Sequence, residues 1–219
     1  MQRFLSLLLV CAAVARADSK SAVEADPTGW IDLMPTDSSM KGWTRLPFPA
    51  RGKQSPDSQW RIDPDTRYVI CNGDKGHEWL RFDREFANFV YHVEWRFLKI
   101  DGPNPRYNSG IYVRNNADAS IWHQAQAGAS SGGWLFGDTP VGGVIQRVDL
   151  RKEVKEERLK PIGEWNTYEV TALGPNISVW TNGAVTNIYA GCEIPKGYVG
   201  LEGEGYKVEF RNVKLKELP

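Results

Sequence analysis

The most regular pattern in this chain is the alternation of apolar and polar side chains over residues 89–97. Successive side chains of a β-strand point to opposite faces, so this alternation predicts a strand with one buried face. The apolar face comprises Phe89, Tyr91, Val93, Trp95 and Phe97. His92, Glu94 and Arg96 lie between them and therefore share the opposite face. There, an imidazole, a carboxylate and a guanidinium are close enough to act on one ligand.

Short β-rich runs broken by Gly, Pro, Asn and Asp follow one another from Gly29 onward, a pattern typical of a β-sandwich or barrel. Asn182-Gly183 between two alternating runs is typical of a tight hairpin. Residues 150–159 are charged all round, which favours a loop or an extended ribbon over a helix. We expect strands over 30–34, 59–63, 67–72, 78–82, 88–99, 109–115, 120–126, 143–149, 166–173, 176–182, 184–190, 197–203 and 206–217.

The same alternation places polar and aromatic groups opposite the core on three further strands. These outward groups are Tyr112 and Arg114, then Trp122, Gln124 and Gln126, and finally Tyr198 and Glu202. A one-residue bulge would reverse any of these assignments. If these strands and the strand at 88–99 are neighbours in one curved sheet, they form a polar, aromatic groove that suits a carbohydrate.

The N-terminus has the features of a secretory signal peptide over residues 1–17. Met1-Gln2-Arg3 is charged, residues 4–15 are apolar, and Ala15-Arg16-Ala17 fits a cleavage site. We expect cleavage near Ala17 and a secreted or periplasmic protein. A lipid anchor on Cys11 is the less favoured alternative, because Val10 matches a lipoprotein signal poorly. Residues 18–28 are polar and predict a flexible leader.

The amino-acid composition narrows the classes of partner and site that this protein can have. The chain carries 27 Lys and Arg against 27 Asp and Glu, so charge gives no reason to expect nucleic acid or an anionic membrane as a partner. Cys71 and Cys192 remain after cleavage and could form one disulfide, although their spacing does not show that they are close. The nine Trp residues fill the core by default, and some could serve as platforms for sugar rings.

Seven motifs in order resemble the 3-keto-disaccharide hydrolase domain family, also described as 3-keto-glucoside 1,2-lyase/3-keto-2-hydroxy-glucal hydratase. The resemblance implies an all-β, two-sheet antiparallel jelly-roll sandwich of the concanavalin A-like lectin/glucanase type, forming a single domain over residues 29–219. It also implies a ligand site on the concave sheet. The motifs are Asp32-Leu33, Gly42-Trp43, Asn108-Ser109-Gly110-Ile111-Tyr112-Val113-Arg114, Gly163-Glu164-Trp165-Asn166-Thr167-Tyr168-Glu169, Asn182-Gly183, Gly197-Tyr198-Val199-Gly200-Leu201-Glu202 and Val208-Glu209-Phe210-Arg211-Asn212-Val213.

The chain departs from the family at one position. The family usually has a Glu-x-Gln pair on the strand after the Asn-Ser-Gly strand, and Gln126 fits its Gln. Gln124 stands where the family carboxylate is common, which puts catalysis by the usual route in doubt. His123 could compensate only if a bulge turned it outward.

Cleavage of a 3-keto-glycoside by elimination needs a base near C2, an electrophile at the 3-oxygen and an acid for the leaving oxygen. Glu94 or His92 is the candidate base, and Glu202 or His123 the candidate acid. Arg96, Arg114 or a bound cation could polarise the ketone. The other candidate substrate-binding residues are Tyr112, Trp122, Gln124, Gln126, Trp134 and Lys160.

A divalent metal ion is a possible cofactor, because Asp101, Asp138 or Asp149 could join Glu94, but no spacing supports such a site. The leading hypothesis is therefore an exported enzyme acting on 3-keto-glycosides. A non-catalytic carbohydrate-binding jelly-roll module is the alternative. A structural or cell-surface interaction domain is a third class, which would not use the polar row.

Overall fold

The computed structural model describes residues 18–101, 105–129 and 131–219. The expected signal peptide, with its cleavage site and Cys11, lies outside these residues. In the part of the chain that is described, no helix is long and apolar enough to cross a membrane.

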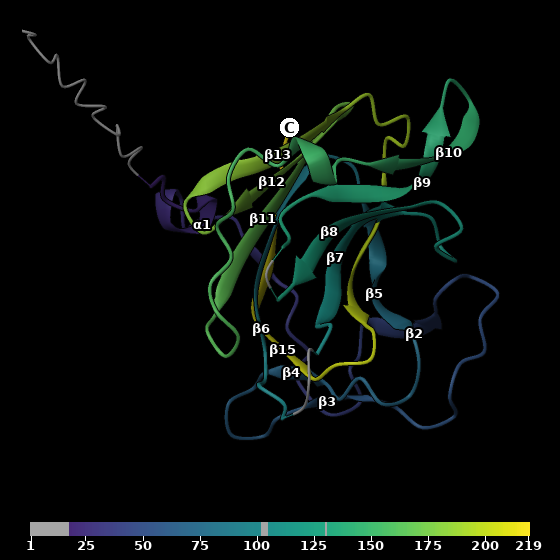
Figure 1. Ribbon diagram of the computed structural model, residues 1–219, viewed down its shortest axis with the longest axis vertical. Coiled ribbons are helices and arrows are strands. Elements are labelled where there is room, and N and C mark those ends of the chain that lie inside the picture. The colour runs from purple at the N-terminus through teal and green to yellow at the C-terminus, as the bar shows by residue number, and fades with distance from the viewer. Residues whose placement is uncertain (1–17, 102–104, 130) are drawn as a thin grey trace, which may run out of the picture.

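Two antiparallel sheets stack face to face and enclose the core (Figure 1). The first, sheet A, has the order β13-β12-β11-β6-β15-β4-β3, with β1 also paired to β15. Its strands are β1 (Ile31–Asp32), β3 (Trp60–Ile62), β4 (Val69–Cys71), β6 (Phe89–Phe97), β11 (Asn166–Leu173), β12 (Asn176–Thr181), β13 (Ala184–Ala190) and β15 (Val208–Glu217).

The second sheet, sheet B, has the order β10-β9-β8-β7-β14-β5-β2. Its strands are β2 (Trp43–Pro47), β5 (Glu78–Phe86), β7 (Asn108–Asn115), β8 (Trp122–Gly128), β9 (Leu135–Val141), β10 (Val144–Asp149) and β14 (Gly197–Gly203). The expected two-sheet antiparallel sandwich is confirmed. Strands β2 and β9 were not predicted, because both contain a proline, which weakens the signal of a strand.

The core lies between the inner faces of the two sheets. The five apolar residues of β6 point into it, and all are at most 1% exposed. They pack with inward residues of sheet B such as Ile111, Val113 and Leu201. Burying each large apolar side chain stabilises the fold by about 1.5–3 kcal/mol, so this alternation fixes which face of β6 points inward. Cys71 and Cys192, whose pairing the sequence left open, are both buried as free thiols.

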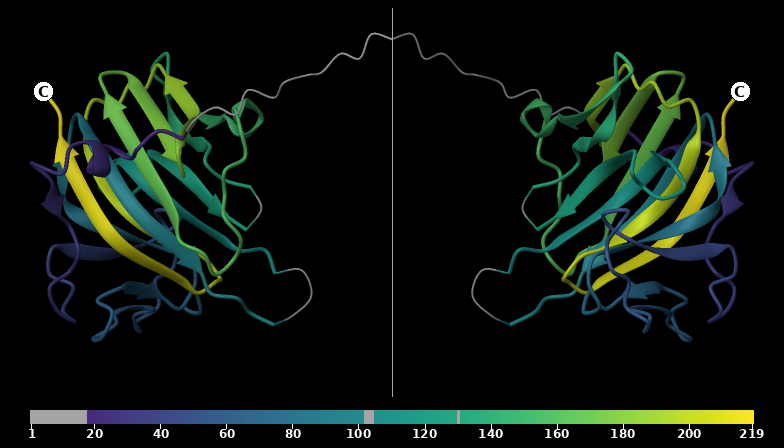
Figure 2. Two further views of the ribbon diagram at one scale, coloured as in Figure 1. Left: turned by 90° about the vertical axis from the view of Figure 1, so that its left-hand side faces the viewer. Right: turned by 90° about the vertical axis from the view of Figure 1, so that its right-hand side faces the viewer.

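Residues 18–28, where the sequence predicts a flexible leader, lie against the outer face of sheet A. They carry the short helix α1 (Ala22–Ala25), whose N-cap residue Ser21 forms a capping box with Glu24. The carboxylate of Glu169 on β11 accepts hydrogen bonds from the backbone N–H groups of Ala22 (2.6 Å) and Val23 (3.2 Å). The left view of Figure 2 faces this side of the molecule and shows the purple α1 near the long yellow strand β15. These hydrogen bonds connect the segment to a carboxylate that is distant in sequence.

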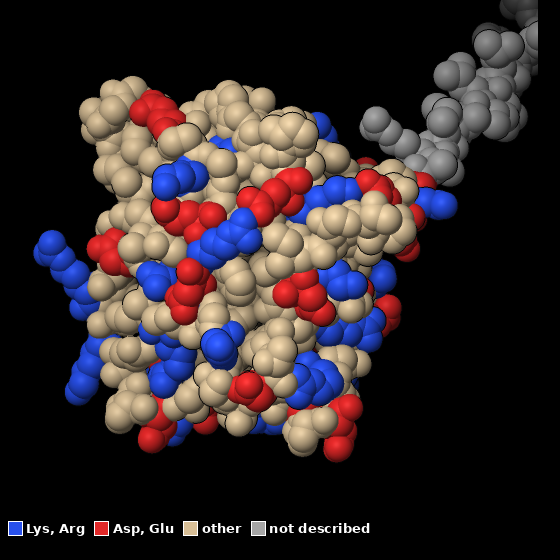
Figure 3. All heavy atoms as spheres, turned by 180° about the vertical axis from the view of Figure 1, so that it is seen from behind, with Lys and Arg blue, Asp and Glu red and all other residues tan. Residues whose placement is uncertain are grey.

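Charges of both signs are interspersed on the face shown in Figure 3. No large area of one sign gathers there. This distribution agrees with equal numbers of acidic and basic residues.

Candidate active site

The predicted row of His92, Glu94 and Arg96 lies on the outer face of sheet A, where each side chain is held by a neighbouring strand. His92 Nδ1 lies 2.9 Å from Glu169 Oε1. Arg96 donates to Glu209 at 2.8 Å. Glu94 accepts hydrogen bonds of 2.6 Å from both Arg211 and Asn212. The alternation along β6 is thus confirmed, but the row is part of a structural ion-pair network.

The acidity of Glu94 argues against its predicted role as a base. Burial raises its pKa, but the bonds from His92, Asn212 and Arg211 outweigh burial and bring the pKa to about 2. A carboxylate with so low a pKa is a weak proton acceptor. The expectation that β6 borders the groove of the other outward strands is wrong, because β6 belongs to sheet A and those strands to sheet B.

The outer face of sheet B carries a groove of about 910 Å³, a size usual for ligand sites. Trp122, Gln124, Gln126, Trp134 and Glu202 all line it, as the sequence predicts. Residues that the sequence reasoning missed complete the lining, among them Phe48, His77, Asn108, Phe136, Arg147, Arg151 and Glu204.

Glu202 lies on the groove floor and is only 2% exposed. Its carboxylate accepts hydrogen bonds from the Tyr112 hydroxyl (2.6 Å) and from Gln124 Nε2 (2.6 Å), and it lies 2.7 Å from His77 Nε2. Tyr112 is itself fully buried, so it supports Glu202 from below and does not line the groove. A buried carboxylate with these three partners is held in one orientation.

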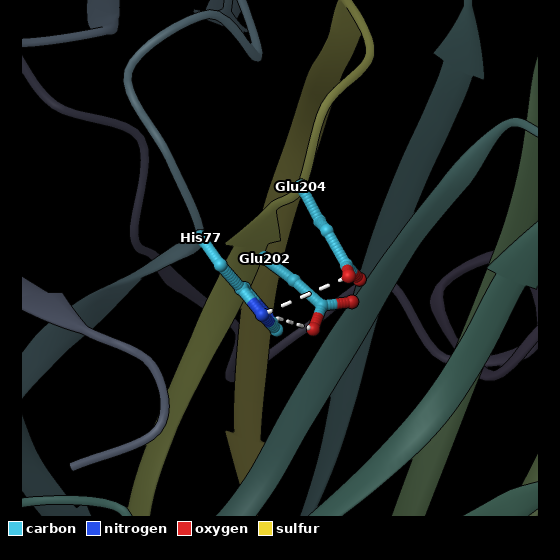
Figure 4. Close-up of side chains that lie close together, drawn as sticks. All are labelled: His77, Glu202 and Glu204. Carbon is cyan, nitrogen blue, oxygen red and sulfur yellow. Dashed lines mark hydrogen bonds and ion pairs between the residues drawn. The ribbon is translucent and has the colours of Figure 1, made fainter. Parts of the chain in front are cut away.

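Glu204, two residues further along the chain, brings a second carboxylate to the same imidazole. Its Oε1 lies 3.8 Å from His77 Nδ1, and the side chains of His77, Glu202 and Glu204 point toward one another (Figure 4). Glu204 lies two residues after Glu202, so the alternation of side chains along a strand could have placed it on the same face. His77 gives no such signal, because it lies in the turn that precedes β5.

Burial and the neighbouring charges shift the pKa values of two members of this group. Burial lowers the pKa of His77, but its hydrogen bond to Glu202 and the nearby negative charges outweigh burial, so the pKa of this imidazole is raised. Burial and the charge of Glu202 raise the pKa of Glu204. Groups with perturbed pKa values gathered in one groove are typical of active sites.

The Asn-Ser-Gly motif at the start of β7 builds the groove floor. Asn108 accepts a hydrogen bond from Gln126 Nε2 (2.6 Å) and donates to Glu204. The Ser109 hydroxyl donates to the backbone oxygen of Glu202 (2.8 Å). At Gly110, a Cβ atom would lie 2.0 Å from Gln124 Nε2, so only glycine leaves room for Gln124 to reach Glu202.

Three further sequence predictions are corrected by the structure. Arg114 has φ of +50°, which breaks the alternation along β7, and its buried guanidinium donates to the backbone oxygens of Ala87, Gly174 and Ile194. His123 points into the protein interior, where it lies 2.8 Å from Thr139 Oγ1. Lys160 lines a separate pocket over sheet A, beside His92. None of the three lines the groove.

Three donor groups of the groove could also hold a cation. The candidate ligand atoms of His77, Glu202 and Glu204 all lie within 4.8 Å of one another, and one imidazole with two carboxylates suits several divalent ions. Of the aspartates that could have joined Glu94 at a metal ion, Asp138 lies on sheet B, where it pairs with Arg147, whereas Glu94 lies on sheet A.

Comparison with models of protein families assigns the chain to one family. Residues 29–216 match the 3-keto-alpha-glucoside-1,2-lyase-like domain. The protein belongs to this family. Among curated proteins, none matches the chain significantly.

Solved structures of other proteins share the fold of this chain. A protein from Parabacteroides distasonis, described as a candidate glycosyl hydrolase, is 17% identical, with 93% of this chain and 100% of that chain covered and a TM-score of 0.61. The carbohydrate-binding module CBM66 from Bacillus subtilis is 16% identical over 80% and 96% of the two chains, with a TM-score of 0.57. A β-glucanase from Bacillus licheniformis is 10% identical over 87% and 99%, with a TM-score of 0.51. The fold is therefore the predicted concanavalin A-like sandwich.

Proposed function

We propose that this protein is an exported enzyme that cleaves 3-keto-glycosides by eliminating the aglycone and then hydrating the glucal that remains. The observation that carries the proposal is the contact of His77 with the carboxylates of Glu202 and Glu204 on the floor of an aromatic groove. Family membership provides the substrate class.

The reaction requires one base and one acid on the same sugar. The C2 proton is acidic because the neighbouring C3 is a ketone, so a base can remove it and leave an enolate. The enolate expels the aglycone oxygen from C1 with the bonding electron pair, and that oxygen takes up a proton. Water then adds to the C1–C2 double bond, with hydroxyl to C1 and a proton to C2, so that the overall change is hydrolysis.

The three groups suit these steps in distinct ways. His77 takes the C2 proton, and the buried carboxylate of Glu202 orients the imidazole and stabilises its charged form, as in other acid–imidazole pairs. Glu204 is more exposed to the groove and has a raised pKa, so it can donate the proton to the leaving oxygen. The amides of Asn108, Gln124 and Gln126 line the same groove and suit sugar hydroxyl groups.

The presence of Gln124 in place of the family carboxylate is compatible with this mechanism. Gln124 stands where the family carboxylate is common, and its Nε2 atom lies 2.6 Å from the carboxylate of Glu202. A negative charge is therefore present next to the family position, on a strand separated from β8 only by β7. Loss of the carboxylate from position 124 does not remove acid–base chemistry from the groove.

Turnover of an aryl 3-keto-glucoside, followed by release of the phenol, tests the proposal. We expect His77→Gln and Glu202→Gln each to lower kcat/KM by about 10²–10⁴-fold, the usual contribution of a positioned acid or base. Glu94→Gln is the matched control, because it removes a carboxylate of similar environment from the opposite sheet. Circular dichroism would establish that all three variants fold. Full activity in both His77→Gln and Glu202→Gln would refute the assignment.

A non-catalytic carbohydrate-binding module is the second candidate function. It is favoured by the aromatic wall of the groove, where the Trp122 and Phe136 rings meet edge to face at 5.1 Å. Such a module would bind the keto-glucoside with an affinity that Trp122→Ala weakens. It would release no phenol, so the same assay combined with calorimetry separates the two functions.

A further inference from the structure

Charged residues line different parts of the groove on sheet B, and besides the pairs described next they include Arg106, which precedes β7. The carboxylates of Glu202 and Glu204 lie at the β14 side, whereas Arg147 and Arg151 follow the lining to the β9–β10 side. Strands β7 and β8 separate β14 from β9, which places the two ends about 14 Å apart at the usual strand spacing. This length exceeds that of one pyranose ring. A substrate whose sugar is cleaved at the acidic end therefore extends its other half toward the basic end.

Each arginine at the basic end lies over a tryptophan. The Arg147 guanidinium lies 5.1 Å from the Trp122 ring centre, and that of Arg151 lies 4.8 Å from the Trp134 ring centre. Arg147 is also bound by both oxygens of Asp138, at 2.6 and 2.8 Å, so its charge is neutralised within the protein. Both arginines thus lie over a tryptophan ring, but only Arg147 has a carboxylate partner among the described residues.

Arg151 forms no ion pair within residues 18–101, 105–129 and 131–219. The residues outside these ranges include no Asp or Glu, so the chain offers no hidden carboxylate partner. A guanidinium that lies over an indole ring still has N–H groups to donate, and its N–H edge matches the two oxygens of a carboxylate. At the β9–β10 side of the groove, Arg147 is paired with Asp138, so Arg151 offers one positive charge there, which is matched by one singly charged anion.

We propose that the leaving half of the substrate carries a carboxylate, which Arg151 binds at the basic end of the groove. This inference rests on the proposed function and specifies the substrate class within it. It makes Arg151 a specificity-determining residue that contacts the leaving group and takes no part in proton transfer. A neutral aglycone would still be cleaved, but less efficiently.

Two aryl 3-keto-glucosides of matched size test this inference, one with a 4-carboxyphenyl and one with a 4-carbamoylphenyl leaving group. The quantity measured is the ratio of their kcat/KM values, acid over amide. Comparing this ratio between wild type and variants cancels the different intrinsic reactivity of the two phenols. Arg151→Gln is the test variant. Lys152→Gln is the matched control, since it removes the neighbouring exposed charge outside the groove.

We expect Arg151→Gln to lower the ratio about fivefold, the effect of losing one partly exposed ion pair, while Lys152→Gln leaves it unchanged. The wild-type ratio should also fall as salt is added, because exposed charges are screened. Equal ratios in wild type and Arg151→Gln would overturn the inference while leaving the proposed function intact, provided that both substrates are cleaved. If wild type cleaves neither substrate, the proposed function fails and the inference fails with it.

Discussion

Lowering the pH from 7 to 4 should reduce the free energy of unfolding, in part because the buried imidazole of His123 then becomes protonated. Replacing His123 by Gln should remove this part of the pH dependence. His123 lies in the interior, with Nε2 at 2.8 Å from Thr139 Oγ1 and at 3.6 Å from Cys192 Sγ. Its Nδ1 atom has no hydrogen-bond partner among the described residues. Burial lowers the pKa of His123 to about 4, and the charge of Arg114 acts in the same direction.

The sign of the effect follows from proton binding. In the unfolded chain the pKa of this imidazole is near 6.5, so between pH 6.5 and about 4 the unfolded state binds more protons than the folded state. The contribution to stability is therefore complete above pH 6.5 and is lost as the pH falls toward 4. At about 1.4 kcal/mol for each pKa unit, the difference between 6.5 and about 4 amounts to about 3 kcal/mol.

Urea denaturation of wild type and His123→Gln at several pH values from 7 to 4 measures this quantity. Carboxylates that titrate in the same range affect both proteins equally, so the difference between the two curves isolates His123. We expect the free energy of unfolding of wild type to fall by about 3 kcal/mol more than that of the variant. Because the chain has three His residues, NMR can also follow each imidazole separately. Parallel curves would refute the reasoning.

Three further predictions concern the groove and the N-terminal segment. Gly110→Ala should displace the Gln124 side chain, lower activity at least tenfold and cost about 1–3 kcal/mol of stability, which kinetics and urea denaturation would measure. The double variant Gln124→Glu with Glu202→Gln should recover part of the activity that Glu202→Gln alone loses, because it returns a carboxylate to the adjacent position. Equal activity of the single and double variants would contradict the idea that Glu202 supplies the negative charge of the family carboxylate. Glu169→Gln should weaken the attachment of α1 and speed amide hydrogen exchange at residues 22 and 23, whereas unchanged exchange would show that other contacts hold the segment.

Some features of this protein could be predicted from local sequence because their causes are local. Alternation along residues 89–97 identified the buried face of β6, since side-chain direction in a strand depends only on parity. The same rule placed Gln124, Gln126 and Glu202 away from the core, and all three line the groove. The ordered motifs identified the family and with it the sandwich fold.

Other features depended on strand pairing, which parity does not determine. The polar row of β6 and the groove of sheet B both face away from the core, but they lie on opposite sides of the sandwich. The backbone at Arg114 adopts positive φ, and this single departure turns the side chain out of the predicted row. His77 reaches Glu202 across 125 positions of sequence, so no local pattern could reveal the pair.

The sequence by itself therefore determined the fold class, the family and the buried or outward direction of most strand residues. The tertiary structure alone decided which outward residues meet: Glu202 lies with His77 in the groove, and Glu94 lies in an ion-pair network on the opposite sheet. The physical reason is that burial of apolar side chains selects a face of each strand locally, while long-range backbone pairing selects its neighbours.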